Sequence, residues 1–293
     1  MTSVLNIGES VRIVLALSKI RISLAVTATT FTGFLVFKGS PQVELIPLLT
    51  GIFMMAGGSS AFNHYQERMT DARMERTSDR PIPSGKVSST FTVIFSLCML
   101  IAGSVILIHN FPPLVLSLGL FNFFWYNAVY TPLKKVTAFA VVPGSLTGGI
   151  PPLIGWVAAG GYWLDPDIII IVLFFITGQI PHFWLLLLKY GRQYEEAGLP
   201  SITAIFTTDQ IKRISNTWIL ATLAASAILL LRGLISHPAA VAAWFAGSLL
   251  LIGSLIYHGL MQKNDSDYKL PFAALNFFYL LIMLLLATDS LTI

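Results

Sequence analysis

The feature that most constrains this chain is a series of apolar runs, each about long enough to cross a lipid bilayer. The hydrocarbon core of a bilayer is about 30 Å thick, so a helix needs about 20 apolar residues to cross it. The runs are too long for strands, and helices satisfy their own backbone hydrogen bonds, as lipid requires. The sequence therefore predicts an all-α polytopic membrane protein with nine transmembrane helices, at residues 21–37, 45–65, 89–109, 113–131, 138–158, 167–188, 211–231, 239–258 and 270–288.

The composition supports this class and limits the partners. Charged residues make up 11% of the chain, against about 25% in soluble domains. We expect residues 1–293 to form a single integral membrane domain, with an interfacial N-terminal segment at about 1–18 and an interfacial helix over 9–20. The net charge of +4 is small and dispersed, which argues against nucleic acid, and the single Cys98 excludes a disulfide framework.

The distribution of Lys and Arg predicts an orientation. Two of the 18 Lys and Arg residues, Lys38 and Arg232, fall on one side of the nine predicted spans, and the other sixteen, including Lys263, fall on the opposite side. Basic residues concentrate in cytoplasmic loops, so we expect a multi-pass protein of a bacterial or archaeal type of cell membrane with a cytoplasmic N-terminus. The long connections 66–88 and 189–210 lie on the cytoplasmic side, where we expect the active-site loops.

The first long loop carries a candidate metal and phosphate site. Asn63, Glu67 and Asp71 are spaced by four residues, which places them on one stripe of a helix. Carboxylates together with phosphate oxygens are typical ligands of Mg²⁺. Arginines bind phosphate with two parallel hydrogen bonds, and three follow at once: Arg73, Arg76 and Arg80. The alternative is a solvated charge cluster whose arginines serve only topology; the mixture of acids and bases favours the site.

Two further segments carry polar residues at the inner ends of spans. Asn127, Tyr130 and Lys134 form a stripe that leads towards the basic loop, where Lys134 could neutralise a leaving diphosphate. The alternative is an aromatic belt at the membrane interface.

His182 lies about two turns inside the sixth span, and Lys189 and Arg192 follow near the same face. A histidine is uncommon at that depth. It could simply hydrogen-bond a neighbouring carbonyl, or it could contact an acceptor substrate, handle protons or bind a haem iron.

With these residues in view, the chain resembles the UbiA superfamily of intramembrane prenyltransferases and, within it, the haem O synthases. The resemblance rests on Asn63-His-Tyr-Gln-Glu67 with Asp71, Met74-Glu-Arg-Thr77, Arg80-Pro81, Tyr126-Asn127, Tyr130-Thr-Pro-Leu-Lys134, Pro151-Pro-Leu-Ile-Gly-Trp156, Pro181-His-Phe-Trp184, Lys189-Tyr190 and Ala197-Gly-Leu-Pro200. Lys19-Ile-Arg21 is similar to the motif that precedes the first span in the family, with Ile20 where proline is usual.

The resemblance implies a bundle with a central cavity and two acidic motifs that bind a diphosphate through Mg²⁺. The first motif corresponds to Asn63, Glu67 and Asp71. At the second, Arg192-Gln193 stands where haem O synthases have adjacent acidic residues. Glu195 and Glu196, one turn later, are the candidates to replace them; otherwise Arg192 would bind phosphate directly.

The resemblance also implies transfer of a farnesyl group from farnesyl diphosphate to the vinyl group of haem b. His182 would then lie near the porphyrin. The basic residues expected to contact the diphosphate are Arg73, Arg76, Arg80, Lys134, Lys189 and Arg192. The cavity for the prenyl chain and acceptor would be lined by Lys19, Arg21, Phe123, Trp125, Tyr126, Asn127, Tyr130, His182, Phe183 and Trp184. The alternatives are an aromatic quinone precursor as acceptor and a non-catalytic haem or isoprenoid carrier. Partnership with haem A synthase or terminal oxidase assembly factors is implied only by the resemblance.

Overall fold

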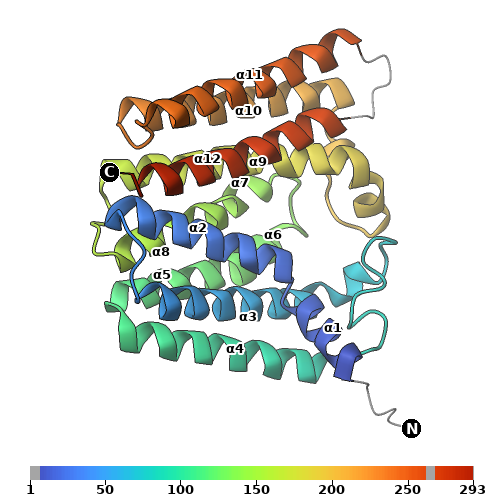
Figure 1. Ribbon diagram of the computed structural model, residues 1–293. Coiled ribbons are helices and arrows are strands. Elements are labelled where there is room, and N and C mark those ends of the chain that lie inside the picture. Colours follow the sequence, from blue (N-terminus) through green and yellow to red (C-terminus); the bar gives the residue numbers. More distant parts are fainter. Residues whose placement is uncertain (1–6, 262–267, 293) are drawn as a thin grey trace.

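The computed structural model describes residues 7–261 and 268–292, and in this part of the chain it contains helices and no strand. The long helices lie side by side in one bundle, and α1 crosses one end of it (Figure 1). The helical elements are α1 Ile7–Leu17, α2 Ile20–Lys38, α3 Leu45–Asp71, α4 Ser89–Asn110, α5 Pro113–Phe124, the π-helix η1 Trp125–Tyr130, α6 Thr131–Leu133, α7 Val141–Gly144, α8 Leu146–Ala158, α9 Pro166–Glu196, the 3-10 helix η2 Ile202–Ala204, α10 Thr208–Leu231, α11 Pro238–Met261 and α12 Lys269–Asp289.

The all-helical prediction is confirmed, whereas the count of nine spans is not. Eight helices of the described residues are long and apolar enough to cross a membrane. The predicted span 113–131 is built from α5, η1 and α6 in succession, so no single α-helix covers it. Pro132 has no N–H to donate, and just before it both the N–H and the hydroxyl of Thr131 bond the carbonyl of Tyr126, five residues back. That spacing is the hydrogen-bond pattern of a π-helix.

Two helices extend well beyond the predicted spans. The prediction ended the second span at 65 and the sixth at 188, because polar residues follow, but α3 continues to Asp71 and α9 to Glu196. The polar residues continue both helices past the apolar core, as the helical stripe predicted for Asn63, Glu67 and Asp71 requires. The predicted span 138–158 corresponds to Val141–Ala158, which is one of the eight, although a turn at Ser145 divides it into α7 and α8.

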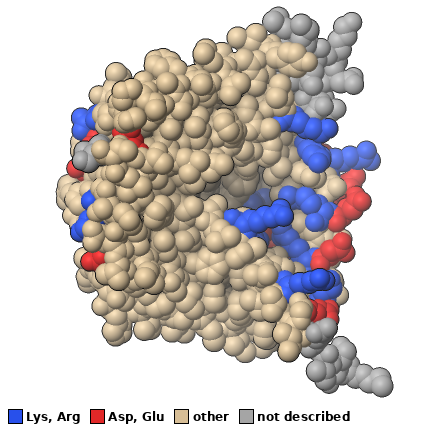
Figure 2. Space-filling view, in the orientation of Figure 1, with Lys and Arg blue, Asp and Glu red and all other residues tan. Residues whose placement is uncertain are grey.

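Charged side chains gather at two opposite ends of the bundle, with a broad uncharged band between them (Figure 2). The N-terminal α1, the 72–88 loop and the 197–207 segment lie at the same end (Figure 1). This arrangement matches the predicted alternation of connections. Lys263 lies outside the described residues.

Helix α1 packs along the end of α3 through Ile13 and Leu17, which contact Ala61. A helix is thus present where one was predicted over 9–20, with bounds Ile7–Leu17. Its location at the membrane interface stays a prediction, and residues 1–6 lie outside the described part. The chain then turns at Lys19, whose φ of 43° is a left-handed conformation. After this turn the side chain of Lys19 points into the bundle and lines its cavity.

Glycines allow α2 and α8 to approach closely. A Cβ built on Gly33 would lie 2.0 Å from the carbonyl oxygen of Pro152, and one on Gly155 would lie 1.9 Å from that of Thr30. Neither position has room for a side chain. Small residues at helix interfaces are typical of packing in membranes, where van der Waals contact drives association. The two helices form one side of the cavity described next.

Candidate active site

A cavity of about 740 Å³ lies among the helices and is lined by residues of α2, α3, α5, α8, α9 and α12. The molecular surface is hollowed beside basic side chains near the middle of the face in Figure 2. One end of the cavity is charged, and the remainder is mostly apolar. Its charged lining consists of Lys19, Arg21, Glu67, Asp71, Arg76, Arg80 and Lys134.

Two carboxylates at the charged end are each paired with a cation. Glu67 forms an ion pair with Lys134, and Oδ2 of Asp71 lies 2.7 Å from Nη1 of Arg80. Glu67 and Asp71 are one helical turn apart on α3, so the predicted stripe does face the cavity. The structure therefore brings together two acids and two bases from three segments of the chain.

Asn63, the first residue of the stripe, has a different place. It is fully buried and does not line the cavity. Nζ of Lys19 donates to its Oδ1 at 2.6 Å, and its Nδ2 donates to the hydroxyl of Thr131 at 3.0 Å. Asn63 thus joins the turn before α2 to the start of α6. Its predicted direct contact with a metal is not supported by this position, because the side chain is fully buried and does not reach the cavity.

The loop after α3 is tied back to the helix and across to α9. The hydroxyl of Thr77 donates to the carbonyl of Asp71 at 2.9 Å. Arg76 donates to the hydroxyl of Tyr194 at 3.2 Å and stacks on Tyr190, with its guanidinium carbon 4.8 Å from the ring centre. These contacts join the two long loops that the sequence placed on one side. In the sequence, Thr77 stood out only as the end of the Met74-Glu-Arg-Thr77 motif, and Tyr194 did not stand out; the spacing of four between Tyr190 and Tyr194 was the available signal.

Two lysines at the charged end have shifted pKa values. Burial lowers the pKa of Lys19 to about 7, and the positive charges of Arg80 and Lys134 add to this, although Glu67 opposes it. Burial also acts to lower the pKa of Lys134, but the adjacent carboxylate of Glu67 outweighs it and raises that pKa. Lys134 is therefore a fixed positive charge at the cavity wall.

The inner part of the cavity is aromatic with a few polar groups. Phe123, Tyr126, Tyr130 and Phe183 line it, as does His182. Nδ1 of His182 is 2.8 Å from Oδ1 of Asn276 on α12. Asn276, Tyr279 and Gln179 also line the cavity. An apolar chamber that ends in paired charges suits a molecule with a long hydrocarbon part and an anionic head.

Comparison with known proteins agrees with this geometry. The model of the UbiA prenyltransferase family matches residues 25–282. The chain belongs to the UbiA prenyltransferase family. It is 30% identical to the protoheme IX farnesyltransferase of Oleidesulfovibrio alaskensis, covering 94% of this chain and 95% of that one. It is 33% identical to the enzyme of that name from Nitratidesulfovibrio vulgaris strain DP4, over 68% and 69% of the two chains.

A solved UbiA homologue from Archaeoglobus fulgidus, bound to GPP and Mg²⁺, shares the fold. Its TM-score is 0.71 at 13% identity, over 96% of this chain and 100% of that one. The all-helical UbiA fold is thus supported over nearly the whole length.

The second motif expected of a UbiA enzyme does not reach the cavity. Glu196 pairs with the exposed Arg192, and Glu195 accepts a hydrogen bond from Thr203. Both glutamates are exposed and neither lines the cavity, so their predicted role as metal ligands is not supported. Within the described residues, no three His, Cys, Asp or Glu side chains gather as a metal site. The predicted diphosphate contacts of Arg73, Lys189 and Arg192 are likewise unsupported, because all three side chains are exposed and outside the cavity.

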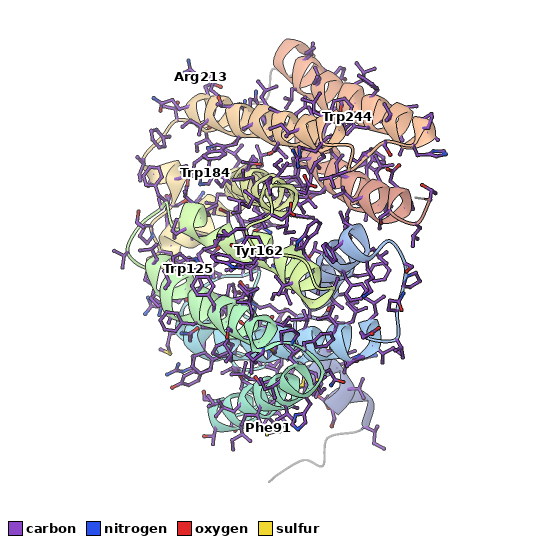
Figure 3. The ribbon with its side chains drawn as sticks, turned by 90° about the vertical axis from the view of Figure 1, so that its left-hand side faces the viewer. Phe91, Trp125, Tyr162, Trp184, Arg213 and Trp244 are labelled. Carbon is purple, nitrogen blue, oxygen red and sulfur yellow. The ribbon has the colours of Figure 1, made fainter. Side chains whose placement is uncertain are left out.

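Three residues predicted to line this UbiA cavity lie behind its wall. Trp184 is 3% exposed and packs with Ile180 and neighbours in a separate apolar cluster. Trp125 donates to the carbonyl of Pro143 at 2.7 Å, and Asn127 donates to Ser59 at 2.7 Å. Both tryptophans can be followed in Figure 3. The reason is the helical period: a residue one or two positions from a cavity-lining residue points in a different direction and contacts a different neighbouring helix.

Proposed function

We propose that this protein transfers the farnesyl group of farnesyl diphosphate to the vinyl group of haem b, giving haem O. The observation that carries the proposal is the cavity, in which the paired charges of Glu67, Lys134, Asp71 and Arg80 open onto an aromatic chamber. The similarity to protoheme IX farnesyltransferases over 94% of the chain supports the choice of acceptor.

The charged end fits Mg²⁺ bound together with a diphosphate. Mg²⁺ is usually held by one or two carboxylates, with phosphate oxygens and waters completing its shell, and Glu67 and Asp71 supply two cavity-lining carboxylates. When bound, the ion would neutralise charge on the diphosphate. A UbiA homologue of known structure binds GPP with Mg²⁺, which supports this assignment.

The cavity's own cations stabilise the leaving group. As the bond between the farnesyl C1 and the diphosphate oxygen breaks, negative charge grows on the diphosphate. Lys134, Arg76 and Arg80 line that end and provide preorganised positive charge. Lys134 is especially suited, because its raised pKa keeps it protonated.

The chamber protects the carbocation until it reacts. Tyr126, Tyr130 and Phe183 line the cavity beside the charged end, and aromatic faces attract cations. The farnesyl C1 then bonds the terminal vinyl carbon, and water adds to the adjacent carbon with loss of a proton, which gives the hydroxyethylfarnesyl group. Exclusion of other water from the chamber prevents premature quenching.

Product mass tests the proposal. Purified protein is incubated with farnesyl diphosphate and Mg²⁺, together with either haem b or a hydroxybenzoate. We expect a farnesylated hydroxyethyl haem, and no product when EDTA removes the metal. A prenylated hydroxybenzoate in place of the haem adduct would reject the acceptor, and diphosphate release without any adduct would reject the transfer.

We also propose that the N-terminus and the charged end of the cavity face the cytoplasm. The accumulation of Lys and Arg at that end supports this orientation. The apolar product would then pass within the membrane to haem A synthase or an oxidase assembly factor, which cross-linking in membranes can detect.

A further inference from the structure

His182 and Asn276 form a polar contact across the cavity wall between α9 and α12. Nδ1 of His182 lies 2.8 Å from Oδ1 of Asn276, and Nδ2 of Asn276 donates to the carbonyl of Phe272 at 2.8 Å. Turning the amide around would place two acceptor oxygens against each other. The helix backbone thus sets the orientation of the amide, and because an amide oxygen only accepts, Nδ1 of His182 carries the hydrogen.

The neutral ring then has its lone pair on Nε2. This atom has no hydrogen-bond partner among the described residues, and it is not one of the partnerless atoms closed off from solvent. His182 lines the cavity. The rings of Phe183 and Phe272, with centroids 5.5 Å and 4.9 Å away, hold the imidazole from two directions.

His64 shows the contrast with a histidine that only fills the interior. It is 2% exposed, lines no part of the cavity, and its Nε2 lies 3.2 Å from the carbonyl of Ala16. The available nitrogen of His182 instead borders a space large enough for a ligand.

A fixed N–H on one nitrogen and an available lone pair on the other is the usual state of a metal-binding histidine. We propose that Nε2 of His182 binds the central metal ion of the porphyrin acceptor, and that Asn276 is the residue that positions it. The inference rests on the proposed function, which supplies the porphyrin. An axial bond of this kind fixes the porphyrin within the chamber, so that a vinyl group is presented to the farnesyl carbon.

Porphyrins with and without a metal separate this role from simple packing. The affinities of the full-length protein for zinc protoporphyrin IX and metal-free protoporphyrin IX are measured in detergent. We expect the wild type to bind the zinc form at least about tenfold more tightly. His182→Ala should bind the two equally, and added imidazole should restore both the preference and the Soret position of bound haem.

Asn276→Leu tests the positioning role. It removes the acceptor for Nδ1–H, so we expect about tenfold weaker binding of zinc protoporphyrin and a shifted Soret band, with unchanged affinity for the metal-free ring. Matched controls are His109→Ala and Asn110→Leu, whose exposed side chains bond only backbone carbonyls near the end of α4. Unchanged binding of farnesyl diphosphate verifies that each variant is folded.

The outcomes distinguish the two proposals. If the wild type makes farnesylated haem but His182→Ala retains the preference for the metal, the axial bond is rejected and the proposed function stands. If Asn276→Leu weakens both porphyrins equally, Asn276 is a packing residue and its positioning role is rejected. If the wild type binds neither porphyrin, both the acceptor and the axial bond are rejected.

Discussion

At the scale of single residues, the charged end of the cavity keeps its carboxylates and cations paired. Asp71 is 1% exposed and Glu67 is 16% exposed at the side chain, and each has a basic partner on another segment of the chain. A buried charge is costly unless it is paired. The pairs therefore allow the ionised groups to stay in a largely apolar protein.

Glu67→Gln tests the metal-binding role of this pair. Loss of the carboxylate weakens the hold on Mg²⁺, so we expect kcat/KM for farnesyl diphosphate to fall on the order of a hundredfold. The matched control is Glu196→Gln, at an exposed carboxylate outside the cavity. An equal loss of activity in Glu196→Gln would show that the second motif also contributes to catalysis and would contradict the assignment to Glu67 alone. Steady-state kinetics at the Mg²⁺ concentration that half-activates the wild type give the comparison.

Thr77→Val tests how the loop is held. The substitution preserves shape but removes the hydrogen bond to the carbonyl of Asp71, which contributes about 1 kcal/mol. Because the loop carries Arg76 and Arg80, we expect KM for farnesyl diphosphate to rise about fivefold. Thr217→Val removes a similar bond on α10, from Thr217 to the carbonyl of Arg213, and should leave KM unchanged. Similar KM values in the two variants would contradict the role of Thr77.

The residue types of the site were predictable, but several of their partners were not. Spacing by four placed Glu67 and Asp71 on one face of α3 because helical geometry is local. The contact between Lys19 and Asn63 joins residues 44 positions apart, and it depends on the left-handed turn before α2. No local pattern in the sequence encodes that turn.

At the scale of elements, the glycines of α2 and α8 determine how closely one wall of the cavity is packed. Gly33 and Gly155 meet backbone atoms of the opposite helix rather than flexible side chains. Any larger residue there must move a helix.

Gly155→Ala is therefore expected to destabilise the protein by about 1–3 kcal/mol. The added Cβ would lie 1.9 Å from a backbone oxygen of Thr30. Gly253→Ala is the control, since nothing lies within 4 Å of the added atom on α11. Thermal unfolding in detergent gives the comparison, and equal melting temperatures would contradict the packing argument.

The positions of the helices could be predicted from the lengths of the apolar runs, but the places where helices are interrupted could not. The prediction of 21–37 lies within the observed α2, because the apolar core sets the length of a simple span. The π-helical segment at Trp125–Tyr130 and the break at Ser145 depend on bonds to particular carbonyls. Hydropathy carries no information about those bonds.

At the scale of the whole molecule, the two ends of the bundle differ in charge and in the length of their connections. The difference predicts the orientation in the membrane. Ser84→Cys and Ser40→Cys, each on a Cys98→Ser background, place single thiols at opposite ends. We expect a membrane-impermeant maleimide to label the Ser40 variant in intact cells and the Ser84 variant only in inverted vesicles. The reverse pattern would overturn the orientation.

The ion pairs of Glu67 with Lys134 and of Asp71 with Arg80 have a thermodynamic consequence for the whole molecule. A metal ion that binds alone engages the carboxylates of Glu67 and Asp71 and leaves Lys134 and Arg80 without their partners. A diphosphate that binds alone engages the two cations and leaves the two carboxylates without theirs. When both ligands bind, the carboxylates of Glu67 and Asp71 contact the metal ion and the cations of Lys134 and Arg80 contact the diphosphate, so each group exchanges one oppositely charged partner for another. We therefore expect strong positive coupling between the two ligands, which isothermal titration of each in the presence and absence of the other would measure as a large difference in Kd. The ligand-free protein thus holds two internal ion pairs that are replaced by ion pairs with the metal and the diphosphate only when both bind.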